Sequence, residues 1–333
     1  MTNNLRIISG TANQALSKEV AEILKTKLCP VEVGKFSDGE TYVHFEESVR
    51  GGDVYVIQPT CPPVNEHLME LLIMVDALKR SSPSKVTVVM PYYGYSRQDK
   101  KIIAREPIGA KLVADMIEVA GADRVIMFDL HAAQIQGFFD IATDHIEHLP
   151  FFAEHILDRN LKDVTVVSPD AGGVANARKL AKLINAPLAI IDKRRPKPNA
   201  VKVGHIIGDV KEKNCVIVDD LVDTAGTIVE AARVLKKHKA KNIFVYATHG
   251  VLSGPAITRI NSSAIKQMII TNSIPLPRER KSVKIKVVSI APIIAETIRT
   301  NHQGVSMGVY FDKIYDRIEQ KSKKVRGGLI EKT

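Results

Sequence analysis

Runs of Val and Ile recur along almost the whole chain, and helix-like stretches separate them. The apolar runs cover residues 54–57, 86–90, 124–128, 164–167, 188–191, 216–218, 243–246 and 287–290. Continuous apolar runs of this length are typical of parallel strands that are buried on both faces. Between them, residues 68–77, 107–120 and 175–184 show the i, i+3, i+4 apolar spacing of packed helices. The alternation predicts layered α/β domains in which right-handed crossovers connect the strands.

A weak internal repeat indicates how many such domains the chain holds. Residues 86–94 (VTVVMPYYG) resemble residues 164–172 (VTVVSPDAG), and residues 125–130 (VIMFDL) resemble residues 216–221 (VIVDDL). Two matches in the same order favour a duplicated fold over chance similarity of common strand patterns. A chain of 333 residues also suggests two domains on length alone. We therefore predict one domain at 1–148, a second at 149–310 whose last segment returns to the first, and a charged extension at 311–333.

The composition narrows the class of protein. With 45% hydrophobic and 25% charged residues, the chain is globular rather than disordered or collagen-like. The longest candidate membrane stretch, residues 287–295, is far shorter than the roughly 20 apolar residues of a spanning helix. The N-terminus lacks the basic and then apolar order of a signal peptide. The three cysteines show no CxxC spacing, which fits a reducing compartment. We expect a soluble cytoplasmic protein with no membrane partner.

Positive charge is concentrated in the second half of the chain. Residues 1–145 hold 15 basic and 19 acidic residues, whereas residues 146–333 hold 32 basic and 18 acidic ones. Such an excess is compatible with nucleic acid, an anionic membrane surface or anionic small molecules as partners. The charge alone does not choose among the three.

The most specific motif is the segment VIVDDLVDTAGT at residues 216–227. A buried strand ends in Asp219 and Asp220, and a short turn then leads to a helix that we expect to open at Ile228. Backbone N–H groups at a helix N-terminus bind phosphate, and Gly226 lets the backbone approach it closely. The competing explanation is ordinary capping, because Asp and Thr are good N-cap residues. The full string resembles the ribose-phosphate binding motif of phosphoribosyltransferases and phosphoribosyl diphosphate synthetases.

Two further segments bear on the choice between those families. Residues 92–101 (YYGYSRQDKK) follow a predicted strand and combine aromatic with cationic groups, which can bind polyphosphate. Residues 36–40 (FSDGE) place an aromatic ring beside two acids, where it could stack on a base. Taken singly, each segment is equally compatible with a solvated surface turn.

Together the motifs resemble the ribose-phosphate pyrophosphokinase family, from residue 5 to about residue 310. The resemblance implies two phosphoribosyltransferase-type domains related by pseudo-twofold symmetry, each with a mainly parallel sheet flanked by helices. It implies synthesis of 5-phospho-α-D-ribose 1-diphosphate and AMP from ATP and ribose 5-phosphate, for nucleotide biosynthesis. It also implies a homohexamer whose ATP site a neighbouring subunit completes, and no nucleic-acid partner.

Residue roles follow from the same resemblance. The ribose 5-phosphate site comprises Asp219, Asp220, Asp223, Thr224, Ala225, Gly226, Thr227 and Arg195. The ATP site comprises Phe36, Asp38, Gly39, Glu40, Arg97, Gln98, Asp99, Lys100 and Lys101. Residues 100–107 would form a lid over the ATP site.

The metal cofactor implied is Mg²⁺, with His131, Asp170 and Asp129 as its candidate residues. Because Mg²⁺ prefers oxygen ligands, Asp129 is more expected as a ligand than His131, and the resemblance is what supports His131. Asp140 and Asp144 are weaker candidates.

The basic run KRRPKP at residues 193–198 comes directly after a predicted strand and resembles the catalytic loop of the family. Taken alone, a charge run is more often a solvated loop. Its position at a strand end and the resemblance together make Lys193 and Arg195 the predicted catalytic residues.

The sequence departs from the family pattern at three places, and two alternative functions remain. Ile102 and Ile103 make the lid more apolar than is usual, Asn176 replaces a basic residue, and Gly308 cannot supply the hydroxyl of an allosteric phosphate site. A non-catalytic homologue would have damaged ATP or KxR motifs, whereas here both are intact. A phosphoribosyltransferase or nucleic-acid-binding regulator would not need residues 36–40 or 97–99.

Overall fold

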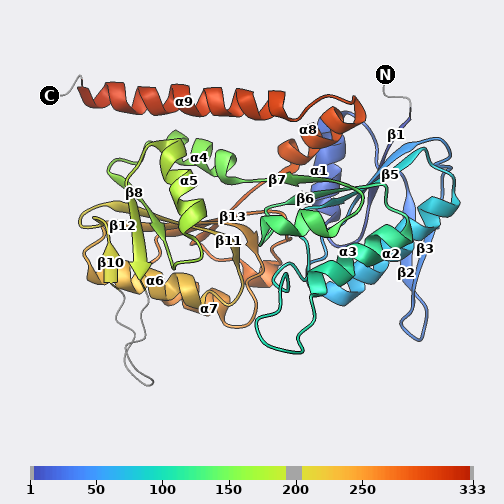
Figure 1. The fold of residues 1–333 in the computed structure, drawn as a ribbon, viewed down its shortest axis with the longest axis horizontal. Helices are drawn as coiled ribbons and strands as arrows, with labels where there is room; N and C mark the ends of the chain where they lie inside the picture. The colour runs from blue at the N-terminus through green and yellow to red at the C-terminus, as the bar shows by residue number, and fades with distance from the viewer. Residues whose placement is uncertain (1–3, 193–204, 331–333) are drawn as a thin grey trace. The chain divides into compact units, whose positions relative to one another are not determined.

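The structure is a computed structural model that describes residues 4–192 and 205–330, with side chains described to residue 323 (Figure 1). The chain divides into two compact units. Unit 1 comprises residues 1–147, 272–275 and 289–307, and unit 2 comprises residues 148–271, 276–288 and 308–333. In the described parts of the chain, no helix is long and apolar enough to cross a membrane.

Unit 1 is built on a parallel sheet with the strand order β1-β4-β5-β6-β7. Its strands are β1 (Leu5–Ser9), β4 (Asp53–Ile57), β5 (Lys85–Met90), β6 (Arg124–Phe128) and β7 (Ala142–Ile146). Its helices are α1 (Gln14–Leu24), α2 (Val64–Arg80), α3 (Gly109–Ala120), the 3₁₀ segment η1 (Ala133–Phe138) and α8 (Ala291–His302). An antiparallel hairpin of β2 (Val31–Lys35) and β3 (Thr41–Phe45) is added to this sheet-and-helix core.

Unit 2 has a larger sheet with the order β10-β9-β8-β11-β12-β13-β14, parallel except for the β10–β9 pair. Its strands are β8 (Val164–Ser168), β9 (Leu188–Asp192), β10 (His205–Ile207), β11 (Asn214–Val222), β12 (Asn242–Gly250), β13 (Gln267–Thr271) and β14 (Ile285–Val288). Helices α4 (Leu149–Asp158) and α5 (Val174–Ile184) cover one face, and α9 (Gly308–Ile330) lies outside them (Figure 1). Helices α6 (Gly226–Lys237) and α7 (Ala256–Ser262) cover the other, and η2 (Arg278–Arg280) precedes β14.

Alternation along the central strands explains why both faces are covered. In β11, Val216 and Val218 belong to the apolar cluster under α4 and α5, whereas Cys215 and Ile217 belong to the cluster under α6 and α7. Successive side chains of a strand point to opposite faces, so a continuous apolar run requires a helical layer on each side. The predicted α/β class with mainly parallel sheets is therefore confirmed.

The internal repeat corresponds to the same pairing register in both units. In unit 1, Val88 of β5 pairs with Val125 of β6. In unit 2, the residues at the matching places of the repeat, Val166 of β8 and Val216 of β11, pair with each other. Because a slip of one residue would turn every side chain to the other face, equal register is a strict test of equivalence. The two strand pairs are thus duplicated in structure as well as in sequence.

Helix α8 belongs to unit 1 although it follows unit 2 in the sequence. The Ser289 hydroxyl donates to Glu19 of α1 at 2.7 Å, and the Tyr55 hydroxyl donates to Asn301 at 2.9 Å. His302 Nδ1 lies 2.6 Å from an Asp53 carboxylate oxygen. These polar contacts attach both ends of α8 to the unit that carries the chain's first strands.

The structure places the strand predicted at 287–290 two residues earlier, at Ile285–Val288. Ser289 ends it, because its hydroxyl accepts from the N–H of Ala291 at 3.1 Å and Pro292 lies in the first turn of α8. The expectation of burial on both faces is wrong here, since β14 is an edge strand and Val287 is 41% exposed.

The charged extension that begins at residue 311 is mostly helix α9, packed on α4 and α5 of unit 2. Ile314 and Ile318 lie one turn apart and are buried against α4, while Glu154 of α4 pairs with Arg317 at 2.9 Å and Lys321 at 3.0 Å. One apolar stripe with charged flanks is enough to attach a helix to a domain.

Replacing Gly94 by alanine is expected to destabilise the fold by about 1–3 kcal/mol. A Cβ at this position would lie 2.5 Å from the Thr60 carbonyl oxygen. The backbone cannot move away without breaking a hydrogen bond, because the N–H of Gly94 donates to the Thr60 hydroxyl at 2.7 Å. Thermal unfolding measures the loss. Gly137→Ala is the control, since nothing lies within 4 Å of a Cβ there; equal melting temperatures for the two variants would contradict the argument.

Candidate active site

The segment 216–227 forms the strand-loop-helix connection between β11 and α6 of unit 2. The helix begins at Gly226, two residues before the predicted Ile228, and Ala225 before it adopts the left-handed conformation with φ of 61°. A non-glycine residue is uncommon in this region, and backbone strain of this kind recurs at binding sites. The Thr224 and Thr227 side chains are exposed beside this turn.

Side-chain capping does not explain this motif. Among the residues that the structure describes, no side chain forms a hydrogen bond at the N-cap of α6, and the first turn of this helix holds no acidic residue. The Asp223 carboxylate instead accepts a hydrogen bond from the Ser253 hydroxyl. The first N–H groups of α6 therefore remain available at the positive end of the helix dipole, which is the arrangement that binds phosphate.

Acidic side chains gather at the carboxyl ends of β8 and β11, which are neighbours in the sheet. Asp219 accepts a hydrogen bond from the N–H of Asp220 at 3.0 Å. Asp170 follows β8, and one of its oxygens accepts from the N–H groups of Gly172 at 3.0 Å and Gly173 at 3.1 Å. Burial raises the pKa of Asp219 well above its usual range, and the negative charges of Asp220 and Asp170 add to this. The acidic side chains at these two strand ends therefore lie close enough together to influence one another's ionisation.

In unit 1, residues 36–40 form the tight turn between β2 and β3. The N–H of Phe36 donates to the Glu40 carbonyl at 2.8 Å, and Gly39 has a positive φ of 97° that favours glycine. The Phe36 ring is 57% exposed and lies 5.2 Å from the Tyr42 ring. An ion pair from Lys35 to Glu66 of α2 holds the hairpin at the residue before this turn. The turn presents an aromatic face and two carboxylates to solvent.

Residues 92–101 connect β5 to α3, also in unit 1. The Tyr93 hydroxyl donates to the Ala110 carbonyl at 2.8 Å, and the N–H of Ala110 donates to the Gln98 carbonyl at 3.2 Å, so the connection is attached to α3. Arg97, Gln98, Lys100 and Lys101 are exposed. Asp99 differs from them: it is buried and accepts from Gln134 of η1 at 3.0 Å.

Asp129 and His131 follow β6 on the turn before η1. Asp129 has a positive φ of 38°, and His131 is exposed. Sequence reasoning missed His145 of β7, whose Nε2 accepts from the N–H of Leu130 at 3.0 Å and so holds this turn. Only the parallel pairing of β6 with β7 brings His145 next to the turn, so no local signal could have revealed it.

The Mg²⁺ site stays a prediction. In residues 4–192 and 205–323, no three His, Cys, Asp or Glu side chains are grouped closely enough to hold a metal ion. Asp144 forms an ion pair with Arg124 at 2.6 Å, so this weaker candidate already has a partner. Lys193 and Arg195, the predicted catalytic pair, lie outside the described residues.

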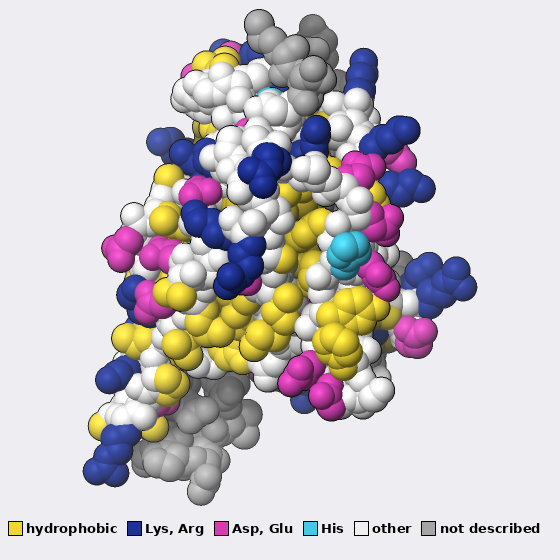
Figure 2. Space-filling model, turned by 90° about the vertical axis from the view of Figure 1, so that its right-hand side faces the viewer, with side chains coloured by type: hydrophobic (Ala, Val, Ile, Leu, Met, Phe, Trp, Pro, Cys, Tyr) yellow, Lys and Arg dark blue, Asp and Glu magenta, His cyan; other side chains and the backbone are white. Residues whose placement is uncertain are grey.

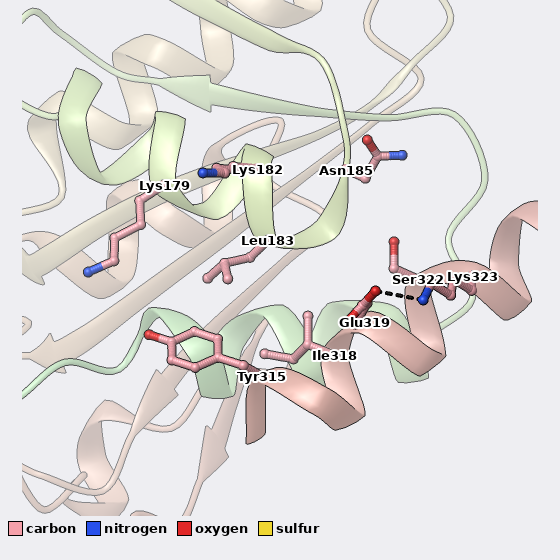
Figure 3. Close-up of a pocket in the computed structure, with 9 residues that line it drawn as sticks. All are labelled: Lys179, Lys182, Leu183, Asn185, Tyr315, Ile318, Glu319, Ser322 and Lys323. Atoms are coloured by element: carbon pink, nitrogen blue, oxygen red, sulfur yellow. Dashed lines mark ion pairs between the residues drawn. The ribbon is translucent and has the colours of Figure 1, made fainter. Parts of the chain in front are cut away.

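A groove of unit 2 lies apart from these motifs. It has a volume of about 510 Å³ and lies between α5 and α9, where Tyr315 and Ile318 face Leu183 (Figure 3). Lys179, Lys182 and Lys323 stand at its rim, and Lys323 pairs with Glu319. None of the predicted site residues that the structure describes lines it.

Comparison with known proteins gives consistent matches over most of the chain. A family model described as the N-terminal domain of ribose phosphate pyrophosphokinase matches residues 5–121, and one described as a phosphoribosyl synthetase-associated domain matches residues 162–312. A protein of Caldanaerobacter subterraneus subsp. tengcongensis named ribose-phosphate pyrophosphokinase is 57% identical over 93% of this chain and 98% of its own length. One of Bacillus subtilis with the same name is 52% identical over 92% and 97%.

A solved structure agrees with these matches. The crystal structure of phosphoribosylpyrophosphate synthetase from Mycobacterium smegmatis aligns with a TM-score of 0.86 at 42% identity, covering 91% of this chain and all of that chain. The motifs, the fold and nearly full-length identity above 50% therefore agree, and this chain belongs to the ribose-phosphate pyrophosphokinase family.

Proposed function

We propose that this enzyme transfers the β,γ-diphosphoryl group of ATP to the C1 hydroxyl of ribose 5-phosphate, giving 5-phospho-α-D-ribose 1-diphosphate and AMP. The observation that carries the proposal is the loop at 223–227, where an uncapped helix N-terminus lies directly after two adjacent carboxylates. One end of this arrangement suits a phosphate and the other suits sugar hydroxyls. A phosphorylated sugar has both groups.

Ribose 5-phosphate binds at the carboxyl edge of the unit 2 sheet. The N–H groups and hydroxyls of residues 223–227 hold the 5-phosphate, and Asp219 and Asp220 accept hydrogen bonds from ribose hydroxyls. Ligands of open α/β sheets bind beyond the carboxyl ends of the strands, which supports this placement. Arg195 contributes a further cation at the same sugar phosphate.

ATP binds through residues of unit 1. The exposed Phe36 ring stacks on the base, while Asp38, Gly39 and Glu40 of the same turn contact the nucleoside. Arg97, Gln98, Lys100 and Lys101 contact the base edge and the polyphosphate. Because Asp99 is buried against Gln134, its part is to hold this connection in shape. Residues 100–107 act as the lid, with the Glu106 carboxylate accepting from the N–H groups of Ile102 at 2.7 Å and Ile103 at 2.9 Å.

The chemistry is a single in-line displacement. The C1 oxygen forms a bond to the β-phosphorus, the bond from that phosphorus to the oxygen bridging to the α-phosphate breaks, and the hydroxyl proton passes to solvent. Lys193 and Arg195 neutralise the negative charge that moves onto the departing AMP. No covalent intermediate with the protein forms.

The candidate metal residues Asp129, Asp170 and His131 fit Mg²⁺ as the cofactor. Mg²⁺ is commonly held by one or two carboxylates together with substrate phosphates and waters, so it does not need a cage of three protein ligands. Asp170 and Asp129 offer the oxygen ligands it prefers, and His131 is the third candidate residue. When bound, Mg²⁺ neutralises polyphosphate charge and so lowers the cost of nucleophilic attack.

The enzyme is proposed to work in the cytoplasm as a homohexamer. Leu112 and Val119 lie two turns apart on one face of α3 and are 61% and 87% exposed. Apolar side chains also gather between charged ones on the face shown in Figure 2. A second copy of the chain would cover such surface. Light scattering tests this, and a mass of one chain at assay concentration would refute it.

One assay separates synthesis from the alternatives. The protein is incubated with Mg²⁺, ATP and ribose 5-phosphate, and AMP is measured. We expect AMP only when the sugar phosphate is present. AMP formation that does not depend on the sugar phosphate would point to ATP hydrolysis, and no AMP despite binding of both substrates would point to a regulatory homologue.

A further inference from the structure

We infer that Arg259 of α7 is a positioning residue for the loop that holds the 5-phosphate, and that its guanidinium adds positive charge to that subsite. The inference rests on the proposed function and deepens it. Arg259 Nη1 donates a hydrogen bond to the Thr224 carbonyl at 3.0 Å. A Cβ at Gly226 would lie 3.6 Å from the same nitrogen. The guanidinium therefore lies against the first residue of α6.

The Thr224 carbonyl is the group whose position decides how the loop is shaped. The next residue, Ala225, is left-handed, which turns the chain sharply into α6. A hydrogen bond from a cation to the preceding carbonyl favours this turn, because it fixes the peptide plane on its N-terminal side. The same turn directs the first N–H groups of α6 outward. Arg259 thus supports the arrangement on which phosphate binding depends.

The guanidinium also retains capacity for a ligand. Arginine has five N–H donors. Within residues 4–192 and 205–323, its one hydrogen-bond acceptor is the Thr224 carbonyl, and no carboxylate forms an ion pair with it. By contrast, Arg233 of α6 is paired with Glu230 at 2.7 Å, as is usual for a surface arginine on a helix. A cation beside a phosphate loop and without an acidic partner is suited to a phosphate dianion.

The backbone that carries Arg259 is fixed to the same loop at several points. The N–H of Leu252 donates to the Val222 carbonyl at 3.0 Å, and the Ser253 hydroxyl donates to Asp223. From the other side, Arg280 Nη1 donates to the Val251 carbonyl at 2.9 Å. The β12–α7 connection therefore keeps Arg259 in register with residues 222–226, which makes a chance contact of a mobile side chain a poor explanation.

The test compares Arg259→Ala, Arg259→Gln and Arg259→Lys with Arg233→Ala, a control at an exposed arginine of the same subdomain. We expect Arg259→Gln and Arg259→Ala to raise the KM for ribose 5-phosphate by about 10- to 100-fold, the range of a charge-assisted hydrogen bond. The KM for ATP should stay within twofold. Arg259→Lys should show a smaller rise, because lysine keeps the charge and an N–H donor group. Arg233→Ala should match the wild type.

A KM for ribose 5-phosphate within twofold of wild type in both Arg259→Ala and Arg259→Gln would overturn the inference. Equal rises in the KM for ribose 5-phosphate and the KM for ATP would also overturn the inference, because they would indicate general damage to the enzyme. If the wild type makes no AMP, the proposed function fails separately. Calorimetric titration with ribose 5-phosphate, and with ribose as the ligand lacking phosphate, then still tests Arg259: only the phosphorylated sugar should lose affinity in the variants.

Discussion

Replacement of Lys193 by alanine is expected to lower kcat by about 10³-fold or more, without loss of the fold. Cations placed on the transferring phosphoryl group act on charge that develops only in the transition state, so their removal affects kcat more than substrate affinity. An arginine placed in this way in other phosphoryl-transfer enzymes contributes about 10³–10⁵ in rate. The measurement is AMP formation at saturating ATP and ribose 5-phosphate, with circular dichroism as the test of folding.

Lys182→Ala is a matched control, since Lys182 lies at the rim of the α5–α9 groove and outside the predicted site. Its turnover should stay within twofold of wild type. A folded Lys193→Ala enzyme with near-normal turnover would remove Lys193 from the mechanism.

Replacement of Asp219 by asparagine is expected to lower kcat/KM for ribose 5-phosphate by about 100-fold or more, because asparagine offers one acceptor where the carboxylate offers two oxygens and a charge. The same change should stabilise the fold. Asp219 is partly buried beside Asp220, with its pKa raised chiefly by that burial. A neutral side chain removes the cost of holding these charges together.

The sign of the pH dependence follows from the raised pKa. The folded state binds the Asp219 proton more tightly than the unfolded state does, so the contribution of Asp219 to stability is full at acidic pH. That contribution is lost as the pH rises from the unfolded pKa toward the folded one at about 8. The gain in stability of Asp219→Asn over wild type should therefore be small near pH 4 and reach at least about 1 kcal/mol near pH 8.

Denaturant unfolding at the two pH values measures this gain. Asp316→Asn on the exposed side of α9 is the control, and no pH-dependent gain is expected from it. A gain for Asp219→Asn that is equal at both pH values would show that charge is not the cause. Stabilisation combined with lost activity is the usual relation at a functional site, where residues are kept for binding at a cost in stability.

Local sequence patterns predicted strands and helices well where a single cause, burial on both faces or helical periodicity, decides the pattern. The runs at 54–57, 86–90 and 124–128 became β4, β5 and β6, because a strand buried on both faces must be apolar at every position. The helix predicted at 175–184 became α5, Val174–Ile184, for the matching reason of helical periodicity. The prediction at 287–290 was wrong because an apolar run does not show where Ser289 ends the strand.

Local patterns could not predict how distant segments of the chain pair with one another. The repeat predicted duplication, yet only the sheets show that Val88 with Val125 and Val166 with Val216 share one register. The apolar pattern of residues 314 and 318 is too short to predict a helix by itself. These two side chains are buried only because the surface of α4 packs against them. Packing surfaces that lie far away in the sequence decide such elements.

By itself, the sequence determined the α/β class, the motif residues of the family and the order in which they occur, because strand burial and phosphate-binding loops depend on residues close together in the chain. Only the tertiary structure decided that α6 has no side-chain cap, that His145 holds the turn at Leu130, and that Arg259 reaches the Thr224 carbonyl. Those contacts join residues 15 to 35 positions apart. The physical reason is that parallel β-pairing sets which strand ends become neighbours, and a side chain contributes to a site through that neighbourhood rather than through its place in the sequence.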